Sequence, residues 1–111
     1  MVEYKLQWSL QLKADLKEIF NYIKDAESSE RAKYVITEIR KTANEIFFSP
    51  TKHAIEPVII DETVRYAVKW SWKILFTISE KHVNIVRIFH TAQNPDKLNY
   101  FLYFPNSLST I

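Results

Sequence analysis

The spacing of apolar residues along the chain predicts, first, a short strand followed by a helix. In residues 2–8 apolar and polar residues alternate, and this period of two is typical of a half-buried strand. From Ser9 the period changes, because apolar residues recur every three or four positions as far as Ile23, which predicts a helix with one apolar face. The side chain of Ser9 is suited to cap the first turn of this helix.

A second helix is predicted directly after the first. Its apolar stripe runs from Ala32 to Ile46, with charged residues on the opposite face, and Ser28 or Ser29 can cap its start. Pro50 follows the last apolar position and ends the helical pattern. Because the link between the two stripes is short, we expect the helices to form an antiparallel hairpin.

The period of two returns after the polar link of residues 49–57. Residues 58–60 are short enough for an edge strand, and three longer alternating stretches follow: residues 63–70, 72–79 and 82–89. Very short links join the longer stretches, which predicts a meander of antiparallel hairpins. The order β-α-α-β-β-β predicts an α+β fold, with the helical hairpin packed on one face of a mostly antiparallel sheet.

Composition excludes several classes of function. The chain has 111 residues, of which 47% are hydrophobic and 25% charged, and this fits one globular domain. It contains no cysteine and no glycine, which excludes disulfide scaffolds, thiolate zinc sites and glycine-rich phosphate loops. The net charge of +2 is far from the excess typical of nucleic-acid-binding proteins. We find no signal peptide and no membrane-spanning stretch, and expect a cytoplasmic protein without membrane association.

Several stretches resemble the RelE/ParE superfamily of bacterial toxins. The resemblance rests on the order of elements, on "ADLKEIFNYI" in the first helix and on "VRYAVKWSWKILFTISEKHVNIVRIFHTAQNPDKL". It implies a RelE/ParE-like toxin domain at residues 1–98. Residues 99–111 would be an apolar extension, packed on that domain or at a contact with the antitoxin or a second protomer in a homodimer. The resemblance further implies the toxin of a type II toxin–antitoxin (plasmid stabilization) system, neutralised by a cognate antitoxin.

Members of this superfamily poison one of two targets, and the two targets require different residues. Some members cut mRNA on the ribosome without a metal ion, so that cations must hold the scissile phosphate and a proton donor must serve the leaving oxygen. Others bind DNA gyrase and need only a binding surface. The resemblance implies no cofactor in either case. Glu56 or Asp61 could supply a carboxylate base for cleavage, although solvated loop charges are the commoner role.

The cleavage set that the resemblance implies is incomplete in this sequence. Arg65 and Lys73 fall where cleaving members place basic residues, and His90 is the candidate proton donor. Gln93 is neutral where cleaving members often carry arginine, and Ala67 stands in place of a second basic residue. We therefore expect a ParE-like toxin that binds DNA gyrase. The alternatives are a metal-independent, ribosome-dependent mRNA endoribonuclease and a degenerate, non-toxic binding module.

Further candidates for binding the target or RNA lie on or beside the same strands: Lys69, Arg87, Trp72 and Gln93. A one-residue link at Ser71 would place Lys69 opposite Lys73 on one face, with Arg65 two positions further along. Like charges directly opposite one another cost stability, so such a pair would indicate a bound anion. The alternative roles are an ordinary solvated sheet face for the lysines and the core for the Trp72 indole.

The pairing of the last hairpin decides where His90 lies. If Glu80-Lys81 is a two-residue turn, Lys73 pairs with Ile88, and His90 shares the face of Lys73. A three-residue turn would instead bring Arg87 to that face. The sequence leaves both open, because a slip of one residue reverses the faces of a strand. His90 could also be only a polar residue that ends the strand.

Overall fold

The N-terminal half of the chain forms the predicted strand and helical hairpin. The structure is a computed structural model, and it describes residues 4–57 and 63–91. Its first elements are β1 (Lys5–Trp8), α1 (Leu10–Ala26) and α2 (Ser29–Ile46). The hydroxyls of Ser9 and Ser28 accept hydrogen bonds from backbone N–H groups in the first turns of α1 and α2, which confirms both as N-caps.

A four-stranded sheet completes the fold. After a short 3-10 helix, η1 (Pro50–Lys52), its strands are β2 (Arg65–Lys69), β3 (Trp72–Ser79) and β4 (His82–His90). The strand order is β1-β4-β3-β2, in which β1 is parallel to β4 and the other neighbours are antiparallel. The α+β fold and the order β-α-α-β-β-β are therefore confirmed. The predicted edge strand at residues 58–60 and the predicted extension at residues 99–111 lie outside the described residues.

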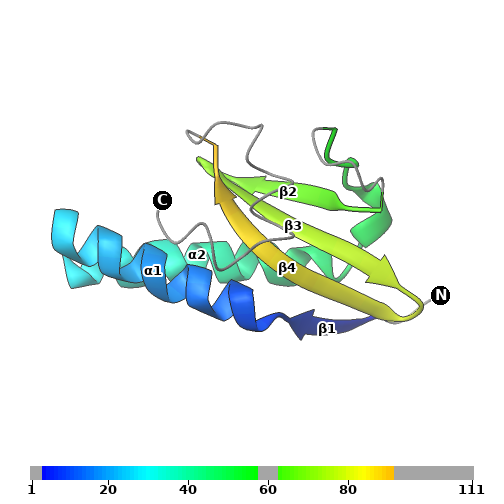
Figure 1. The fold of residues 1–111 in the computed structure, drawn as a ribbon, viewed down its shortest axis with the longest axis horizontal. Helices are drawn as coiled ribbons and strands as arrows, with labels where there is room; N and C mark the ends of the chain where they lie inside the picture. The colour runs from blue at the N-terminus through cyan, green and yellow to red at the C-terminus, as the bar shows by residue number, and fades with distance from the viewer. Residues whose placement is uncertain (1–3, 58–62, 92–111) are drawn as a thin grey trace.

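Both helices lie on one face of the sheet (Figure 1). α1 packs against β4 and α2 packs against β2, and apolar side chains fill the space between the layers. Fully buried members of this core are Leu12, Ile19, Ile39, Ile46, Ile74, Phe76 and Ile85. Burial of each such side chain contributes about 1.5–3 kcal/mol. In the described part of the chain, no helix is both long and apolar enough to span a membrane.

Both hairpins turn on two residues. Trp70-Ser71 joins β2 to β3, and Glu80-Lys81 joins β3 to β4. The first residue of each turn has left-handed backbone, with φ of 52° at Trp70 and 49° at Glu80. Gly, Asn or Asp usually occupies such positions, and this chain has no glycine to use there. The expected one-residue link at Ser71 is therefore wrong. Of the two turn lengths left open at Glu80-Lys81, the structure has the two-residue turn.

A β-bulge interrupts the hairpin of β3 and β4. On its turn side Phe76 pairs with Ile85, and on its other side Leu75 pairs with Arg87, so that β4 contributes one extra residue. A bulge shifts the pairing by one residue along the rest of a hairpin. The Ser9 hydroxyl donates a hydrogen bond of 2.6 Å to the carbonyl of Val86, the extra residue. The start of α1 therefore fastens the bulge.

Candidate functional site

The structure does not bring the candidate cleavage residues together. Beyond the bulge, Lys73 pairs with Phe89 and His90 pairs with Trp72. Paired residues share a face and successive residues alternate, so His90 faces the helical layer and Lys73 faces away from it. The alternative in which the two residues share a face is therefore wrong. The turn has the two residues that this alternative required, but the bulge reverses the consequence for His90.

Lys73 lies in a polar cluster on the sheet face turned away from the helices. Its Nζ is 2.7 Å from Oε2 of Glu56 and 4.6 Å from the ring centroid of Tyr66. An ion pair and a cation–π contact both stabilise an ammonium group. Glu56 is buried, so the expectation of a solvated loop charge is wrong for this residue. Asp61 lies outside the described residues.

Backbone hydrogen bonds hold the loop that carries Glu56 against the outer edge of β2. The Glu56 N–H donates to the Val64 carbonyl at 2.8 Å, and the Tyr66 N–H donates to the Ala54 carbonyl at 3.0 Å. Ile55 also forms an isolated antiparallel bridge with β2. Because bonded backbone fixes the direction of the side chains between its bonds, the carboxylate of Glu56 is directed to Lys73 by the fold itself.

Arg65 binds the preceding part of the same loop. Its Nη1 donates to the carbonyls of His53 at 2.6 Å and Thr51 at 3.4 Å. Arg65 pairs with Phe76, whose ring meets the His53 ring edge-on at 5.6 Å between centroids. The alternation of β2 places Arg65 on the helical face, opposite to that of Lys73. Burial, together with the charges of Lys52 and Arg65, lowers the pKa of His53 and favours its neutral form.

Lys69 and the neighbouring turn form a cluster with α2. The Lys69 Nζ is 3.6 Å from Oε1 of Glu38 and 4.6 Å from the ring centroid of Trp70. The Trp70 and Tyr34 rings are 5.9 Å apart, and about half of each residue is exposed. Since the link at this turn has two residues, Lys69 does not lie opposite Lys73. The expected pair of facing lysines is therefore absent.

Trp72 and His90 pack together on the helical face. The Trp72 side chain is buried in the core, and its ring meets the His90 imidazole edge-on with 4.5 Å between centroids. This position favours the core interpretation of Trp72 over stacking on a target. His90 and Trp72 border a hollow of about 270 Å³ near the turn between the helices. Gln93, the remaining binding candidate, lies outside the described residues.

Arg87 is buried in an ion pair with α1. Its Nε and Nη2 donate to Oδ2 and Oδ1 of Asp15 at 2.8 and 2.9 Å, and the Ile88 N–H donates to Oδ2 at 3.1 Å. Burial raises the pKa of Asp15, although Arg87 and the Ile88 N–H act in the opposite direction. The arrangement gives Arg87 a role in fastening α1 to β4. It also leaves the guanidinium buried rather than on a binding surface.

Arg87 and Lys73 each pair with an acidic residue, and only one of these two acidic residues could be found from the sequence pattern. Asp15 interrupts the apolar stripe of α1, between Leu12 and Ile19, and a charge on a buried helix face requires a partner. Glu56 lies in an irregular loop without periodicity, so no pattern marks its burial. Among the described residues, no group of three or more His, Cys, Asp or Glu side chains could hold a metal ion.

Two solved structures share this fold. The chain is similar to the chromosomal ParDE toxin–antitoxin system from P. aeruginosa, with 21% identity and a TM-score of 0.70 over 79% of this chain and 96% of that chain. It is also similar to the toxin–antitoxin complex RelBE2 from Mycobacterium tuberculosis, with 16% identity and a TM-score of 0.62 over 84% and 97% of the two chains. At these identities the likeness shows the fold alone.

Sequence comparison identifies the family. A search of curated protein sequences found no match. The family model described as "ParE toxin of type II toxin-antitoxin system, parDE" matches residues 6–95, which is most of the chain. This range spans every helix and strand from Leu6 to the end of β4. The chain therefore belongs to the ParE toxin family of type II toxin–antitoxin systems, within the RelE/ParE superfamily.

Proposed function

We propose that this chain inhibits growth by binding an essential target, DNA gyrase, and that a cognate antitoxin neutralises it. The observation that supports binding over cleavage is the bulge in β4, which sets His90 and Lys73 on opposite sheet faces. A cleaving toxin needs a proton donor and a cation at the same phosphate. Side chains on opposite faces project away from each other, so these two do not form such a set.

The contacts of Lys73 and Arg65 also support target binding over RNA cleavage. Lys73 binds the Glu56 carboxylate, and Arg65 binds the His53 carbonyl. An RNA phosphate would have to displace acceptors that the fold already supplies. The ribosome-dependent endoribonuclease with Arg65, Lys73 and His90 as its catalytic residues is the alternative, and it requires these contacts to rearrange.

Lys69 remains our candidate for contact with the target, together with the two aromatic rings beside it. Trp70 and Tyr34 are each about half exposed, and Trp and Tyr contribute much of the binding energy at protein interfaces. The left-handed backbone of Trp70 costs roughly 1–2 kcal/mol. A bulky residue kept at that cost, with its indole on the surface, is consistent with a role in recognition.

The neutralising partner is proposed from the family and from the neighbouring structures. The family is defined as the toxin of a toxin–antitoxin system, and the two similar structures are a toxin–antitoxin system and a toxin–antitoxin complex. A short acidic protein encoded beside this chain would support the assignment. Growth should recover when that protein is produced together with the toxin.

The test is controlled expression of the chain in bacteria without antitoxin. Protein synthesis, cleavage of mRNA on the ribosome and supercoiling of a reporter plasmid are followed separately. We expect supercoiling to be lost while mRNA stays intact. Early mRNA cleavage would overturn the proposal in favour of the endoribonuclease, and normal growth would favour the degenerate module.

A variant at His90 gives a second readout. His90→Gln removes the titratable imidazole and keeps a polar side chain, and thermal melting checks that the variant is folded. A toxin that binds its target keeps its toxicity in this variant, whereas a nuclease that uses His90 as proton donor loses it. Loss of toxicity in a folded variant would therefore contradict the binding mechanism.

A further inference from the structure

A hollow lies where the turn between the two helices meets the end of the sheet. It has a volume of about 270 Å³. Its lining residues come from both helices at that turn, from the β2–β3 turn and from the two central strands: Ile23, Glu27, Arg31, Val35, Trp70, Ser71, Trp72 and His90. Cavities that bind drug-sized molecules measure roughly 300–1,000 Å³, so this hollow suits a smaller molecule.

The floor of the hollow is apolar, and an aromatic side chain borders it. Ile23, Val35 and Trp72 belong to the core and are 7%, 5% and 8% exposed. Trp70 lines the same hollow and is 48% exposed. An apolar side chain that enters the hollow therefore meets core residues below it and an accessible indole beside it.

Two opposite charges stand above this floor. Glu27 is the C-cap of α1, and Arg31 lies in the first turn of α2. The helix dipole disfavours an anion at a C-terminal end and a cation at an N-terminal end, so both charges are in unfavourable positions. Among residues 4–57 and 63–91, the ion pairs involve neither Glu27 nor Arg31. A ligand that supplies both counter-charges therefore stabilises both side chains.

The Arg31 guanidinium can bind a carboxylate although it already contacts an aromatic ring. Its Cζ lies over the Tyr34 ring, 5.4 Å from the centroid. Contact with a ring engages the face of the planar guanidinium. The N–H groups along its edge remain able to donate to both oxygens of a carboxylate.

Backbone hydrogen bonds hold the parts of the hollow in place. The Thr91 N–H donates to the Ser71 carbonyl at 2.7 Å, which ties the end of β4 to the β2–β3 turn. The Glu27 N–H donates to the Ile23 carbonyl at 2.8 Å at the end of α1. A ligand therefore meets a site that is largely preformed, which lowers the entropic cost of binding.

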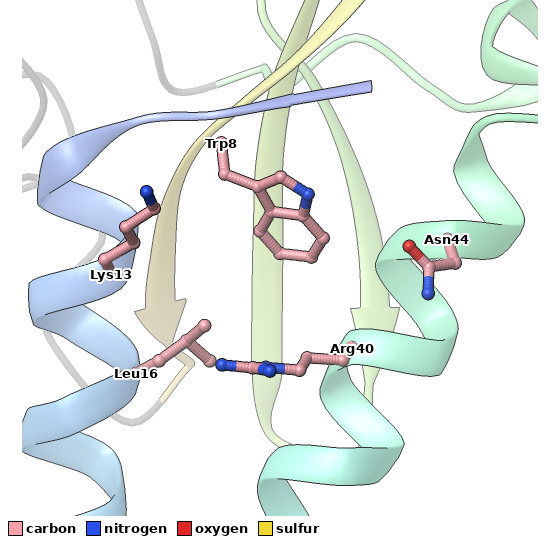
Figure 2. A pocket seen from close by; sticks show the side chains of 5 residues that line it. All are labelled: Trp8, Lys13, Leu16, Arg40 and Asn44. Carbon is pink, nitrogen blue, oxygen red and sulfur yellow. The ribbon is translucent and has the colours of Figure 1, made fainter. Parts of the chain in front are cut away.

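A second hollow between the helices, shown in Figure 2, provides a contrast. It has a volume of about 320 Å³, and the described residues that line it are Trp8, Lys13, Leu16, Arg40 and Asn44. In Figure 2 the Arg40 side chain extends from α2 toward Leu16 of α1. Both hollows combine an arginine of α2 with an indole and apolar surface. Only the hollow at the turn adds a carboxylate, that of Glu27.

We propose that the hollow at the turn binds a free α-amino acid with an apolar side chain, such as leucine or phenylalanine. Its carboxylate binds the Arg31 guanidinium, its ammonium group binds the Glu27 carboxylate, and its side chain packs on the apolar floor. An α-amino acid carries both charges on one carbon atom beside its side chain, whereas the end of a polypeptide carries only one of them. This binding does not depend on which target the toxin poisons.

The test is a titration of the full chain, made isotope-labelled by cell-free synthesis and followed by NMR through its indole N–H signals. The chain has three tryptophans: Trp70 and Trp72 line this hollow, and Trp8 lines the other. We expect leucine and phenylalanine to shift the Trp70 and Trp72 signals with a Kd below about 1 mM, while the Trp8 signal stays in place. An equal or larger shift at Trp8, or no saturation by roughly 10 mM, would overturn the proposal.

Analogues of leucine that lack one feature separate the contacts. Isocaproate lacks the ammonium group, isoamylamine lacks the carboxylate, and glycine lacks the apolar side chain. Each should bind at least about tenfold more weakly than leucine, because a charged hydrogen bond or the apolar contact is lost. An analogue that binds as tightly as leucine would contradict the proposed set of contacts.

Variants that remove one charge locate the two ends of the ligand. Arg31→Gln should weaken leucine binding at least about tenfold but should not weaken isoamylamine binding, because that amine has no carboxylate. Glu27→Gln should likewise weaken leucine binding at least about tenfold and should not weaken isocaproate binding. If either variant weakened the analogue as much as leucine, the assigned orientation would be wrong.

Arg40→Gln is the matched control. Arg40 is also an arginine of α2, but it lines the hollow of Figure 2, so its replacement should change leucine affinity less than about twofold. Glu27, Arg31 and Arg40 are all exposed, and the amide spectrum of each variant shows that it is folded. An effect of Arg40→Gln equal to that of Arg31→Gln would sink the proposal.

Discussion

Among the ion pairs of the described residues, Asp15–Arg87 and Glu56–Lys73 differ in how far their charges are removed from water. In the pair between α1 and β4, the side chains of Asp15 and Arg87 are only 9% and 5% exposed. In the pair between the η1–β2 loop and β3, the Glu56 side chain is fully buried but the Lys73 side chain is 23% exposed. The first pair is closed to solvent, and the second is open on its lysine side.

The buried pair is also held by more hydrogen bonds than the pair that is open to solvent. The planar guanidinium of Arg87 makes two parallel hydrogen bonds to Asp15, which fix both position and orientation. Lys73 makes one contact of 2.7 Å to Glu56, and its ammonium is a point charge on a flexible stem. The Asp15–Arg87 pair therefore sets the position of α1 on β4. Lys73 is the cation that can change partners with less disruption.

The largest effect is expected from Asp15→Ala. This change leaves the buried Arg87 guanidinium without its carboxylate, and breaking such a pair costs about 3–5 kcal/mol in the free energy of unfolding. Chemical denaturation measures the loss. Asp25→Ala, at an exposed position of the same helix, is the control and should stay within about 0.5 kcal/mol of the wild type. A loss below about 1 kcal/mol for Asp15→Ala would show that the closed pair is no stronger than a surface pair.

Replacement of both charges sharpens this result. Asp15→Leu combined with Arg87→Met removes the ion pair without leaving a buried charge, and such exchanges are often neutral or stabilising. We expect the double variant to be more stable than Asp15→Ala, as measured by the same denaturation. If it is less stable, the specific geometry of the pair, including the Ile88 N–H bond, contributes more than the avoidance of an unpaired charge.

A smaller and asymmetric effect is expected at the open pair. Lys73→Met leaves the buried Glu56 carboxylate without its cation and should cost about 1–3 kcal/mol. Glu56→Gln leaves Lys73, which reaches water, and should cost about half as much. Urea denaturation of both variants gives the order. Equal losses, or a larger loss for Glu56→Gln, would contradict the assignment of Lys73 as the solvent-accessible partner.

The parts of the fold that the sequence predicted depend on local signals. Ser9 and Ser28 cap helices through bonds within three residues, and the strand periods follow from burial of alternate residues. The short link at Glu80-Lys81, whose length the sequence left open, is also a local feature. These signals gave the order of elements and the helical hairpin, which in turn supported the family resemblance.

The faces of the candidate site residues could not be predicted, because they depend on contacts between distant segments. The bulge at Val86 is tied to Ser9, 77 positions away in the chain, and it alone moves His90 to the helical face. The burial of Glu56 depends on bonds from an irregular loop to the edge of β2. A pattern within one strand carries no information about either contact.

The smallest predicted effect is a difference in pH dependence between the region around Glu56–Lys73 and the region around Asp15–Arg87. Burial lowers the pKa of His53, in the loop that leads to Glu56. The favourable contribution of His53 to the free energy of unfolding is therefore present above its unfolded pKa of 6.5. This contribution is lost as pH falls through the folded pKa. Burial raises the pKa of Asp15, so its contribution is full below the unfolded pKa of 3.8 and is lost as pH rises through the folded pKa.

Acidification from about pH 7 to about pH 5 should therefore loosen the loop beside β2 before it affects the contact of α1 with β4. Amide hydrogen exchange, corrected for the intrinsic effect of pH, measures both regions in one sample. The Tyr66 amide, which bonds to the loop, should lose protection first, and the Ile88 amide, which bonds to Asp15, should keep it. His53→Gln should remove the early loss at Tyr66. If Ile88 loses protection together with Tyr66, the two pairs open as one unit and the distinction between them fails.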